Sequence, residues 1–207
     1  FRSQQITCVD GSTFQMYMAN MKSIFMDMIK NTDMVIFNRC KKEDPLPTYR
    51  RGIKVANQRA EVIFEDEEGE LGDIFQDEMP FDMNAPVIEI LPEDYGIWFV
   101  DAMDHPENYE GKTVKFKARV MKPRGMVSKF FVPGRTAMTC CADDTTFLGY
   151  VCKSAYAPKL TPGEWVEVTA KVGIEKRNEY QGEEGIVLAA EHVEQCDPLE
   201  DEMVFFN

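Results

Sequence analysis

Apolar residues recur at three- and four-residue intervals between residues 10 and 30, which is the spacing of an amphipathic helix. The set consists of Phe14, Tyr17, Met18, Met21, Ile24, Phe25 and Met28. Ser12 or Thr13 stands just before it and is the expected N-cap. The short apolar run Met34–Phe37 then predicts a strand. This part of the chain therefore reads as mixed helix and strand.

The next segments are less regular. Two prolines in Glu43–Thr48 predict a loop, and Ile53–Glu65 predicts a strand or one arm of a hairpin. The acidic run Glu65–Glu70 predicts a solvated turn. A Ca²⁺ loop is the alternative for this run, but the Asp-x-Asp-x-Asp-Gly spacing of an EF-hand does not fit it.

Strict alternation of apolar and polar residues marks the second half of the chain. In Thr113–Lys122, one face carries Val114, Phe116, Ala118 and Val120, and the other carries Lys115, Lys117, Arg119 and Met121. Four further strands are expected, at Lys129–Cys141, Thr146–Lys153, Trp165–Val172 and Ile186–Val193. Five short strands separated by turn signals are typical of a small antiparallel barrel of the OB type.

A strand and a helix are expected just ahead of these five strands. Ala85–Leu91 reads as a strand, and Pro92-Glu93-Asp94 predicts a helix start that His105-Pro106 ends. The predicted fold class is therefore α+β. Residues 1–85 form an N-terminal α/β region with an acidic loop, and residues 86–207 form an OB-like β-barrel domain.

Charge is distributed in blocks along the 207 residues, although the formal total is −13. Residues 1–60 carry a net +5, residues 61–110 a net −17, residues 111–180 a net +7, and residues 181–207 a net −8. Long-range repulsion from the acidic blocks opposes nucleic-acid binding by the +7 segment, so no nucleic-acid partner is expected. The −17 block of this chain and anionic lipid headgroups are alternative contacts for its basic strand face and loop.

The second half of the chain resembles a known bacterial family, the YcgQ-type permease subunits, over about residues 86–207. The residues that carry the resemblance are Ile88–Leu91, Trp98-Phe99, Pro106–Lys112, Phe130-Phe131-Val132, Arg135, Met138–Asp144, Gly149, Trp165–Val168 and Ile186–Val193. The matching region of that family is its C-terminal soluble domain, which has no known function. The chain departs from the family at its end, where Asp197–Glu200 and Val204–Phe206 replace a tail rich in proline and tyrosine.

The resemblance implies a non-catalytic accessory or binding domain of a membrane permease system, with no cofactor. It implies a multi-spanning permease as partner and a membrane-associated, extracytoplasmic location, with the anchor outside this chain. No run of about 20 apolar residues occurs in the sequence itself. Two other functions stay open: a nucleic-acid-binding OB protein, and a thiol-based metal or metalloid-binding protein.

The candidate binding residues are Arg135, Cys140, Cys141, Asp144 and Trp165. Strand alternation places Cys140 and Cys141 on opposite faces, so both cannot ligate one metal ion without a bulge. One thiolate with Asp144 and a further ligand would suit Zn²⁺ or a softer ion, and Cys152 is the third metal candidate. Redox chemistry of the thiols and a structural role are the alternatives. In the structural role, one cysteine packs inside the barrel while Arg135 pairs with Asp143 or Asp144.

Other potential ligands are sparse. Among the six cysteines no CxxC occurs, and His105 and His192 are the only histidines. His105 is expected in a surface turn, and His192 on the Leu188 and Ala190 side of its strand. The methionines of the first helix suggest Cu(I), but methionine at helical spacing more often packs in a core.

Overall fold

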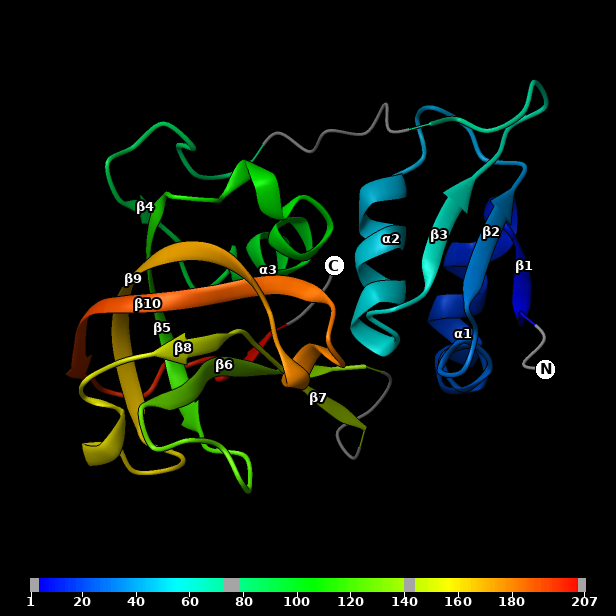
Figure 1. Cartoon of the computed structure of the whole chain (residues 1–207). Helices are drawn as coiled ribbons and strands as arrows, with labels where there is room; N and C mark the ends of the chain where they lie inside the picture. The colour runs from blue at the N-terminus through cyan, green and yellow to red at the C-terminus, as the bar shows by residue number, and fades with distance from the viewer. Residues whose placement is uncertain (1–3, 73–78, 140–143, 205–207) are drawn as a thin grey trace. The chain divides into compact units, whose positions relative to one another are not determined.

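The computed structural model describes residues 4–72, 79–139 and 144–204 (Figure 1). The chain divides into two compact units, and each is described by itself. The first contains the residues up to Gly72 together with 138–139 and 144–146, and the second contains 79–137 and 147–204.

The first unit is a three-stranded parallel sheet with two helices. Its elements are β1 (Ile6–Asp10), α1 (Gly11–Ile29), β2 (Met34–Asn38), α2 (Leu46–Ala56) and β3 (Glu61–Phe64), and the strand order is β1-β2-β3. The register is unbroken, with Ile6 opposite Met34 and Met34 opposite Glu61. Two successive right-handed crossovers in this order place both helices on one face of the sheet.

An aromatic cluster forms the core on that face. Phe14 of α1 lies at its centre, with its ring centroid 5.2 Å from that of Phe25, 4.9 Å from Phe37 and 4.5 Å from Tyr49. The strands and helices that surround the cluster contribute Val9, Met26, Ile29, Val35, Leu46, Ile53 and Phe64. The apolar spacing therefore predicts the helix correctly, but of the expected apolar face only Phe14 and Phe25 are buried, and the helix buries Met26 and Ile29 instead of Tyr17, Met21, Ile24 and Met28.

Two expectations for this unit are wrong in detail. Asp10, rather than Ser12 or Thr13, is the N-cap of α1, and it accepts a hydrogen bond of 3.0 Å from the Ser12 backbone N–H. Helix α2 replaces the predicted loop at Glu43–Thr48 and the start of the predicted strand at Ile53–Glu65. Proline is tolerated in the first turn of a helix, where the missing N–H has no partner in any case.

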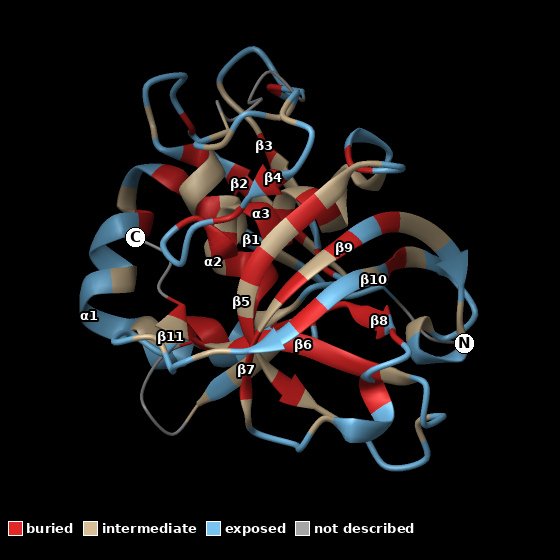
Figure 2. Cartoon of the chain, turned by 90° about the vertical axis from the view of Figure 1, so that its left-hand side faces the viewer, coloured by how far each residue is buried: buried red, intermediate tan, exposed pale blue. Residues whose placement is uncertain are grey.

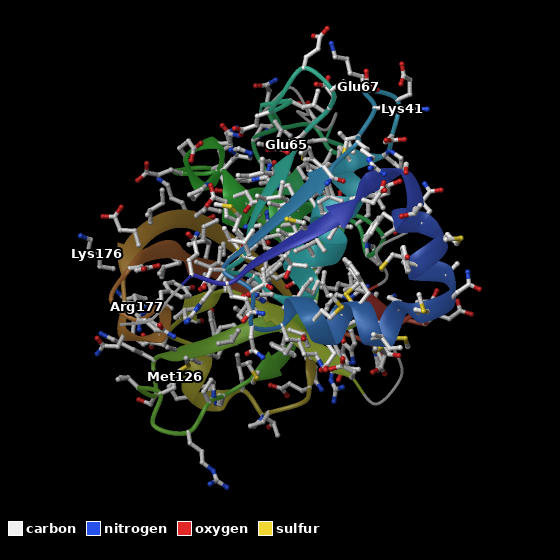
Figure 3. The ribbon with its side chains drawn as sticks, turned by 90° about the vertical axis from the view of Figure 1, so that its right-hand side faces the viewer. Lys41, Glu65, Glu67, Met126, Lys176 and Arg177 are labelled. Atoms are coloured by element: carbon white, nitrogen blue, oxygen red, sulfur yellow. The ribbon has the colours of Figure 1, made fainter. Side chains whose placement is uncertain are left out.

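The acidic run Glu65–Glu70 is a turn, as expected. Glu65 and Glu70 form an isolated antiparallel bridge. The Asp66 carboxylate accepts from the backbone N–H groups of Glu68, at 2.7 Å, and Gly69, at 3.1 Å. Glu65 and Glu67 are labelled in Figure 3, where Glu67 projects from the turn into solvent.

The second unit is built on a closed five-stranded barrel. Its elements are β4 (Ile88–Glu89), α3 (Tyr95–Asp104), β5 (Thr113–Met121), β6 (Phe130–Met138), β7 (Thr145–Gly149), β8 (Val151–Lys153), β9 (Trp165–Lys176), β10 (Glu184–Gln195) and β11 (Met203–Val204). The barrel closes in the order β5-β6-β8-β10-β9 and back to β5, with β8 and β10 parallel and the other pairs antiparallel. The fold class is α+β with an OB-like barrel, which confirms the prediction.

Alternation in β5 predicts the barrel interior correctly. Val114, Phe116, Ala118 and Val120 are all buried. Helix α3 packs on them through Trp98, whose ring centroid lies 4.8 Å from that of Phe116. The predicted strand Ala85–Leu91 shrinks to the two residues of β4, and α3 begins at Tyr95 with Asp94 as N-cap, beyond Pro92.

Two glycines allow β6 and β7 to approach each other closely. A Cβ built on Gly149 would lie 2.6 Å from the Pro133 carbonyl oxygen, and one on Gly134 would overlap the Leu148 carbonyl oxygen and the Phe147 ring. Any side chain at either position would push the strands apart. Within the three described ranges, no helix has the length and apolar character needed to cross a membrane.

Candidate functional site

Arg135 is a buried residue of the barrel unit and only 2% of it is exposed. Its guanidinium donates to the carbonyl oxygens of Pro92, of Asp201 at 2.8 Å and of Met203 at 3.2 Å. The cation also lies over the Tyr95 ring, with Cζ 5.6 Å from the centroid. Arg135 therefore holds three backbone segments together, and its charge points into the protein.

Asp144 makes different contacts from those expected. Its carbonyl oxygen accepts from the Thr139 hydroxyl at 2.7 Å and from the Thr139 N–H at 3.0 Å. Its carboxylate pairs with Lys30 at 3.1 Å, rather than with Arg135. Cys140, Cys141 and Asp143 lie outside the described residues, so the assignment of one thiol to each strand face stays a prediction.

Cys152 is a fully buried core residue of β8. It pairs with Phe131 across β6 and with Leu188 across β10. Burial raises the pKa of its thiol from near 9 to about 12. A metal ligand has to be the thiolate, so this position opposes metal binding at neutral pH.

Trp165 likewise belongs to the core, with 5% of its surface exposed. It begins β9, where it pairs with Arg119, and its carbonyl oxygen accepts from the Cys196 N–H at 3.0 Å. A stacking role for its ring toward a ligand would require the barrel edge to open. Of the candidate binding set, Arg135 and Trp165 are thus buried, Asp144 pairs with Lys30, and Cys140 and Cys141 lie outside the described residues.

Both histidines lie on the surface. His105 is near Glu107, with Nδ1 3.7 Å from the carboxylate, and it caps α3 at the C-terminal end as expected. His192 does not share the Leu188 face, because a β-bulge between Ala190 and His192 reverses the alternation. It is exposed and 3.3 Å from the Glu194 carboxylate. Among the described residues no cluster of three His, Cys, Asp or Glu side chains has the arrangement of a metal site.

Strand β6 begins with an aromatic residue that the sequence analysis did not include in the candidate site. Phe130 starts β6 and is half-buried beneath Arg177, whose Cζ lies 4.3 Å from the ring centroid. Arg177 is itself held by Glu179, at 3.2 and 2.8 Å, and lies 3.7 Å from Glu175. Figure 3 labels Arg177 beside Lys176. The aromatic platform is covered, and the cation over it is already neutralised.

The basic face of β5 is also neutralised in part. Lys115 pairs with Glu167 at 2.9 Å, and this pair raises the pKa of Lys115. Arg119 lies 3.7 Å from Glu202. These partners lie on β9 and near the end of the chain, so the acidic residues that screen this face come from the barrel unit itself.

A basic and apolar surface remains at one end of the barrel, which we call the basic loop surface. It comprises the loop Lys122–Lys129 together with Lys153, Tyr156 and Lys159. Val127 is 59% exposed and Tyr156 47% exposed. Met126, labelled in Figure 3, lies on the same loop. This surface therefore combines cations with exposed apolar side chains.

Hydrogen bonds to backbone carbonyl oxygens hold the basic loop surface together. The Ser154 N–H donates to the Lys129 carbonyl oxygen at 2.9 Å. Lys122 Nζ donates to the carbonyl oxygens of Ala157 and Leu160, both at 2.6 Å. The loop and the segment after β8 therefore form one continuous surface of the barrel.

Comparison with protein families matches residues 70–206 to the model of the DUF1980 C-terminal domain. The chain belongs to the DUF1980 C-terminal domain family. This agrees with the resemblance to YcgQ-type permease subunits and gives the domain no established function. The match includes the whole barrel, the Arg135 contacts and the basic loop surface, and it leaves most of the first unit outside.

No curated protein matches the sequence. Among solved structures, the DUF1980 chain is similar to the mitochondrial single-stranded DNA-binding protein Rim1 of S. cerevisiae, with 10% identity and a TM-score of 0.26 over 42% of this chain and 97% of that one. It is also similar to the aspartyl tRNA synthetase of Entamoeba histolytica, with 16% identity and a TM-score of 0.29 over 45% of this chain and 21% of that one. Likenesses at this level carry no functional argument.

Proposed function

We propose that this DUF1980 chain is a non-catalytic accessory domain of a membrane permease system and that it acts against an anionic membrane surface. The basic loop surface is the observation that carries the proposal. Its exposed side chains include the cations Arg124, Lys129 and Lys153 and the apolar residues Val127 and Tyr156. The family resemblance supplies the permease as partner and the extracytoplasmic side as location.

The charge of this surface is opposite to that of the chain as a whole. Residues 122–129 and 153–159 contain five Lys and Arg and no Asp or Glu, whereas the chain carries −13. Each Lys or Arg near an anionic bilayer contributes about 1 kcal/mol of attraction, which acts within about 10 Å of the surface. The acidic blocks oppose binding in any other orientation, so the domain would approach lipid with this end first.

The apolar side chains support contact with the bilayer interface. Val127 is exposed on the loop, and Tyr156 combines an apolar ring with a hydroxyl group. Tyrosine is enriched at membrane–water interfaces for that reason. Apolar residues surrounded by cations are typical of segments that bind a membrane surface. Such segments reach the headgroup region of the bilayer and do not cross it.

Vesicle co-sedimentation tests the lipid contact. The chain should bind vesicles that contain 30% phosphatidylglycerol at about 50 mM salt, release at about 500 mM, and ignore pure phosphatidylcholine vesicles. The double variant Arg124→Glu/Lys129→Glu should lose at least about tenfold in affinity. Lys171→Glu/Lys176→Glu is the matched control, because it makes the same change of net charge at two exposed positions of β9.

Failure to bind anionic vesicles at low salt would exclude the membrane contact, as would an equal loss of affinity in the control variant.

The permease partner needs its own measurement. The chain fixed to beads should retain a multi-spanning permease from detergent-solubilised membranes, identified by mass spectrometry. If lipid binding occurs and no permease is retained, the membrane contact stands and the permease assignment fails.

A further inference from the structure

Strand β1 is an open edge of the sheet in the first unit. Among the described residues it pairs with β2 alone, from Ile6 to Asp10. Natural edge strands are usually protected by lysine, proline or a bulge, because their free backbone groups invite another strand. The sequence ITCVD of β1 has none of these, and its register with β2 has no irregularity.

The hydrogen-bond pattern shows which backbone groups are open. The Gln5 carbonyl oxygen accepts from the N–H groups of Asp33 and Met34, at 2.9 and 3.3 Å, so the backbone groups of Gln5 point toward β2. The backbone N–H and C=O groups of alternate residues in a strand point to the same side. The backbone groups of Thr7 and Val9 therefore also point toward β2, and those of Ile6 and Cys8 point to the open side.

Helix α1 carries an exposed apolar stripe beside this edge. Tyr17, Met21, Ile24 and Met28 follow one another at intervals of four, three and four residues and are 40%, 41%, 63% and 55% exposed. Alternating intervals of three and four form the seam along which one helix packs on another. The stripe continues across the kink that α1 has at Met21. In Figure 2 the outer side of α1 is largely pale blue, the colour of exposed residues.

The edge and the stripe meet in one groove. Its volume is about 470 Å³, and its lining consists of Thr7, Cys8, Val9, Asp10, Thr13, Tyr17, Met21, Ile24, Phe25 and Met28. Asp10 is the single charged side chain in that lining, and it pairs with Arg39 at 2.8 Å. The groove is therefore apolar and without net charge, on a chain of −13.

We infer that this surface binds a second copy of the same chain, through β1 against β1 and α1 against α1. The occupant has to present a strand and a helix side by side, because the open features are a strand edge and a helical seam. A two-fold axis beside β1 supplies both from the second copy. The product is a six-stranded sheet with the two α1 helices next to each other on one face.

The spacing of a parallel α/β unit fits this pairing. Strands lie about 4.8 Å apart, and a crossover helix lies over the gap between the two strands that it joins. Two α1 helices related by the axis would then be about 10 Å apart, which is the distance at which helices pack. An isolated extended peptide would satisfy the strand edge but would leave the helical seam without a helix.

The apolar area is of the size that a dimer needs. With roughly 200 Å² for a fully exposed side chain of this kind, the four stripe residues offer about 400 Å². A standard interface buries about 800 Å² on each partner, of which a little more than half is apolar. The neutral groove also keeps the acidic blocks of the two copies out of direct opposition.

Light scattering coupled to gel filtration tests the inference on the full chain. At about 20 µM the mass should be twice the 23.8 kDa of one chain. Ile24→Glu should give the mass of a single chain, with unchanged circular dichroism, because Ile24 is exposed and lies in the seam. Met16→Glu is the matched control: Met16 is 57% exposed on the same helix but outside the groove lining, and this variant should stay a dimer.

Thiol cross-linking gives a second readout. Cys8 is exposed on β1, and the two copies would bring their Cys8 side chains within about 10 Å of each other. A short bis-maleimide should yield a covalent dimer, and Cys8→Ser should abolish it. A single-chain mass for the unmodified protein would overturn the inference. A dimer that survives Ile24→Glu, or that forms with another protein in place of a second copy, would also overturn it.

Discussion

Arg135 of β6 lies over the ring of Tyr95 at the start of α3, with 5.6 Å between Arg135 Cζ and the ring centroid. The Tyr95 hydroxyl donates to the Leu148 carbonyl oxygen at 3.0 Å, so the ring is fixed on both sides. Burial lowers the pKa of Arg135, and the nearby Tyr95, Asp201 and Glu93 oppose that shift. The pair connects the helix to the barrel wall and to the segment after β10.

Replacing Arg135 should therefore lower stability more than it changes any binding. Arg135→Met removes the donors to Pro92, Asp201 and Met203 and leaves buried carbonyl groups without a partner. The free energy of unfolding should fall by about 3 kcal/mol, measured by urea denaturation. Arg124→Met at the exposed loop is the control and should stay within about 0.5 kcal/mol. An Arg135→Met variant as stable as the parent would make the Arg135 contacts incidental.

The sequence predicted the parts of the fold that depend on periodicity. Alternation located β5 and its buried residues, and helical spacing located α1. It failed at α2, where prolines at the first turn concealed a helix whose buried residues Leu46, Tyr49 and Ile53 have the right spacing. The choice between loop and helix there depends on packing against Phe14 and Phe37, residues distant in sequence.

The candidate site was less predictable. A basic residue beside cysteines suggested chemistry at Arg135, but the carbonyl groups that it binds lie 43 to 68 residues away in the chain. Phe130 was missed because Arg177, which covers it, comes from a turn 47 residues later (177 − 130). The exposed apolar stripe of α1 was expected to pack in the core. Helical spacing identifies an apolar face, but it does not show whether another element covers that face.

The buried thiol of Cys152 should make the free energy of unfolding fall as the pH becomes alkaline. The pKa of Cys152 is about 12 in the folded chain and near 9 when unfolded, so the folded state keeps a proton that the unfolded state loses. The stability from this group is complete below pH 9 and declines as pH rises from 9 to 12. Unfolding measured across that range should show a shallower decline for Cys152→Ala. Cys8→Ala, at an exposed position, is the control, and a parallel decline in both variants would contradict the assignment.

Oligonucleotides should bind weakly, because the barrel face that would stack bases is occupied. Arg177 covers Phe130 and is held by Glu179, and Lys115 is held by Glu167. Fluorescence anisotropy at about 150 mM salt should give a dissociation constant for single-stranded DNA weaker than about 1 µM. Glu179→Gln partly frees Arg177 and should strengthen binding at low salt. Tight binding by the unmodified chain would revive the nucleic-acid function.

Limited proteolysis should cut first in the acidic turn. Glu67, Glu68 and Gly69 are exposed there, and the turn is held mainly by the bridge at its base and by Asp66. A glutamate-specific protease should nick after Glu67 or Glu68 and leave a C-terminal fragment that contains the barrel. Edman sequencing identifies the new terminus. Cleavage after Glu167, within the β9 strand of the barrel, before cleavage of the turn would show that the barrel is not the more stable part.

Alkylation of the native protein should separate the cysteines by exposure and thiolate character. Cys152 is the internal standard for a protected thiol, because it is fully buried and its pKa is about 12. Strand alternation predicts that Cys141 turns inward and Cys140 outward, so iodoacetamide under reducing conditions should label Cys140 well before Cys141. Peptide mass mapping at pH 7.5 measures both rates against the Cys152 peptide. Labelling of Cys140 at the rate of a free thiol keeps a thiol-based metal or metalloid site open at that position. Protection of both residues to the level of Cys152 would make the Cys-Cys pair structural and remove that function.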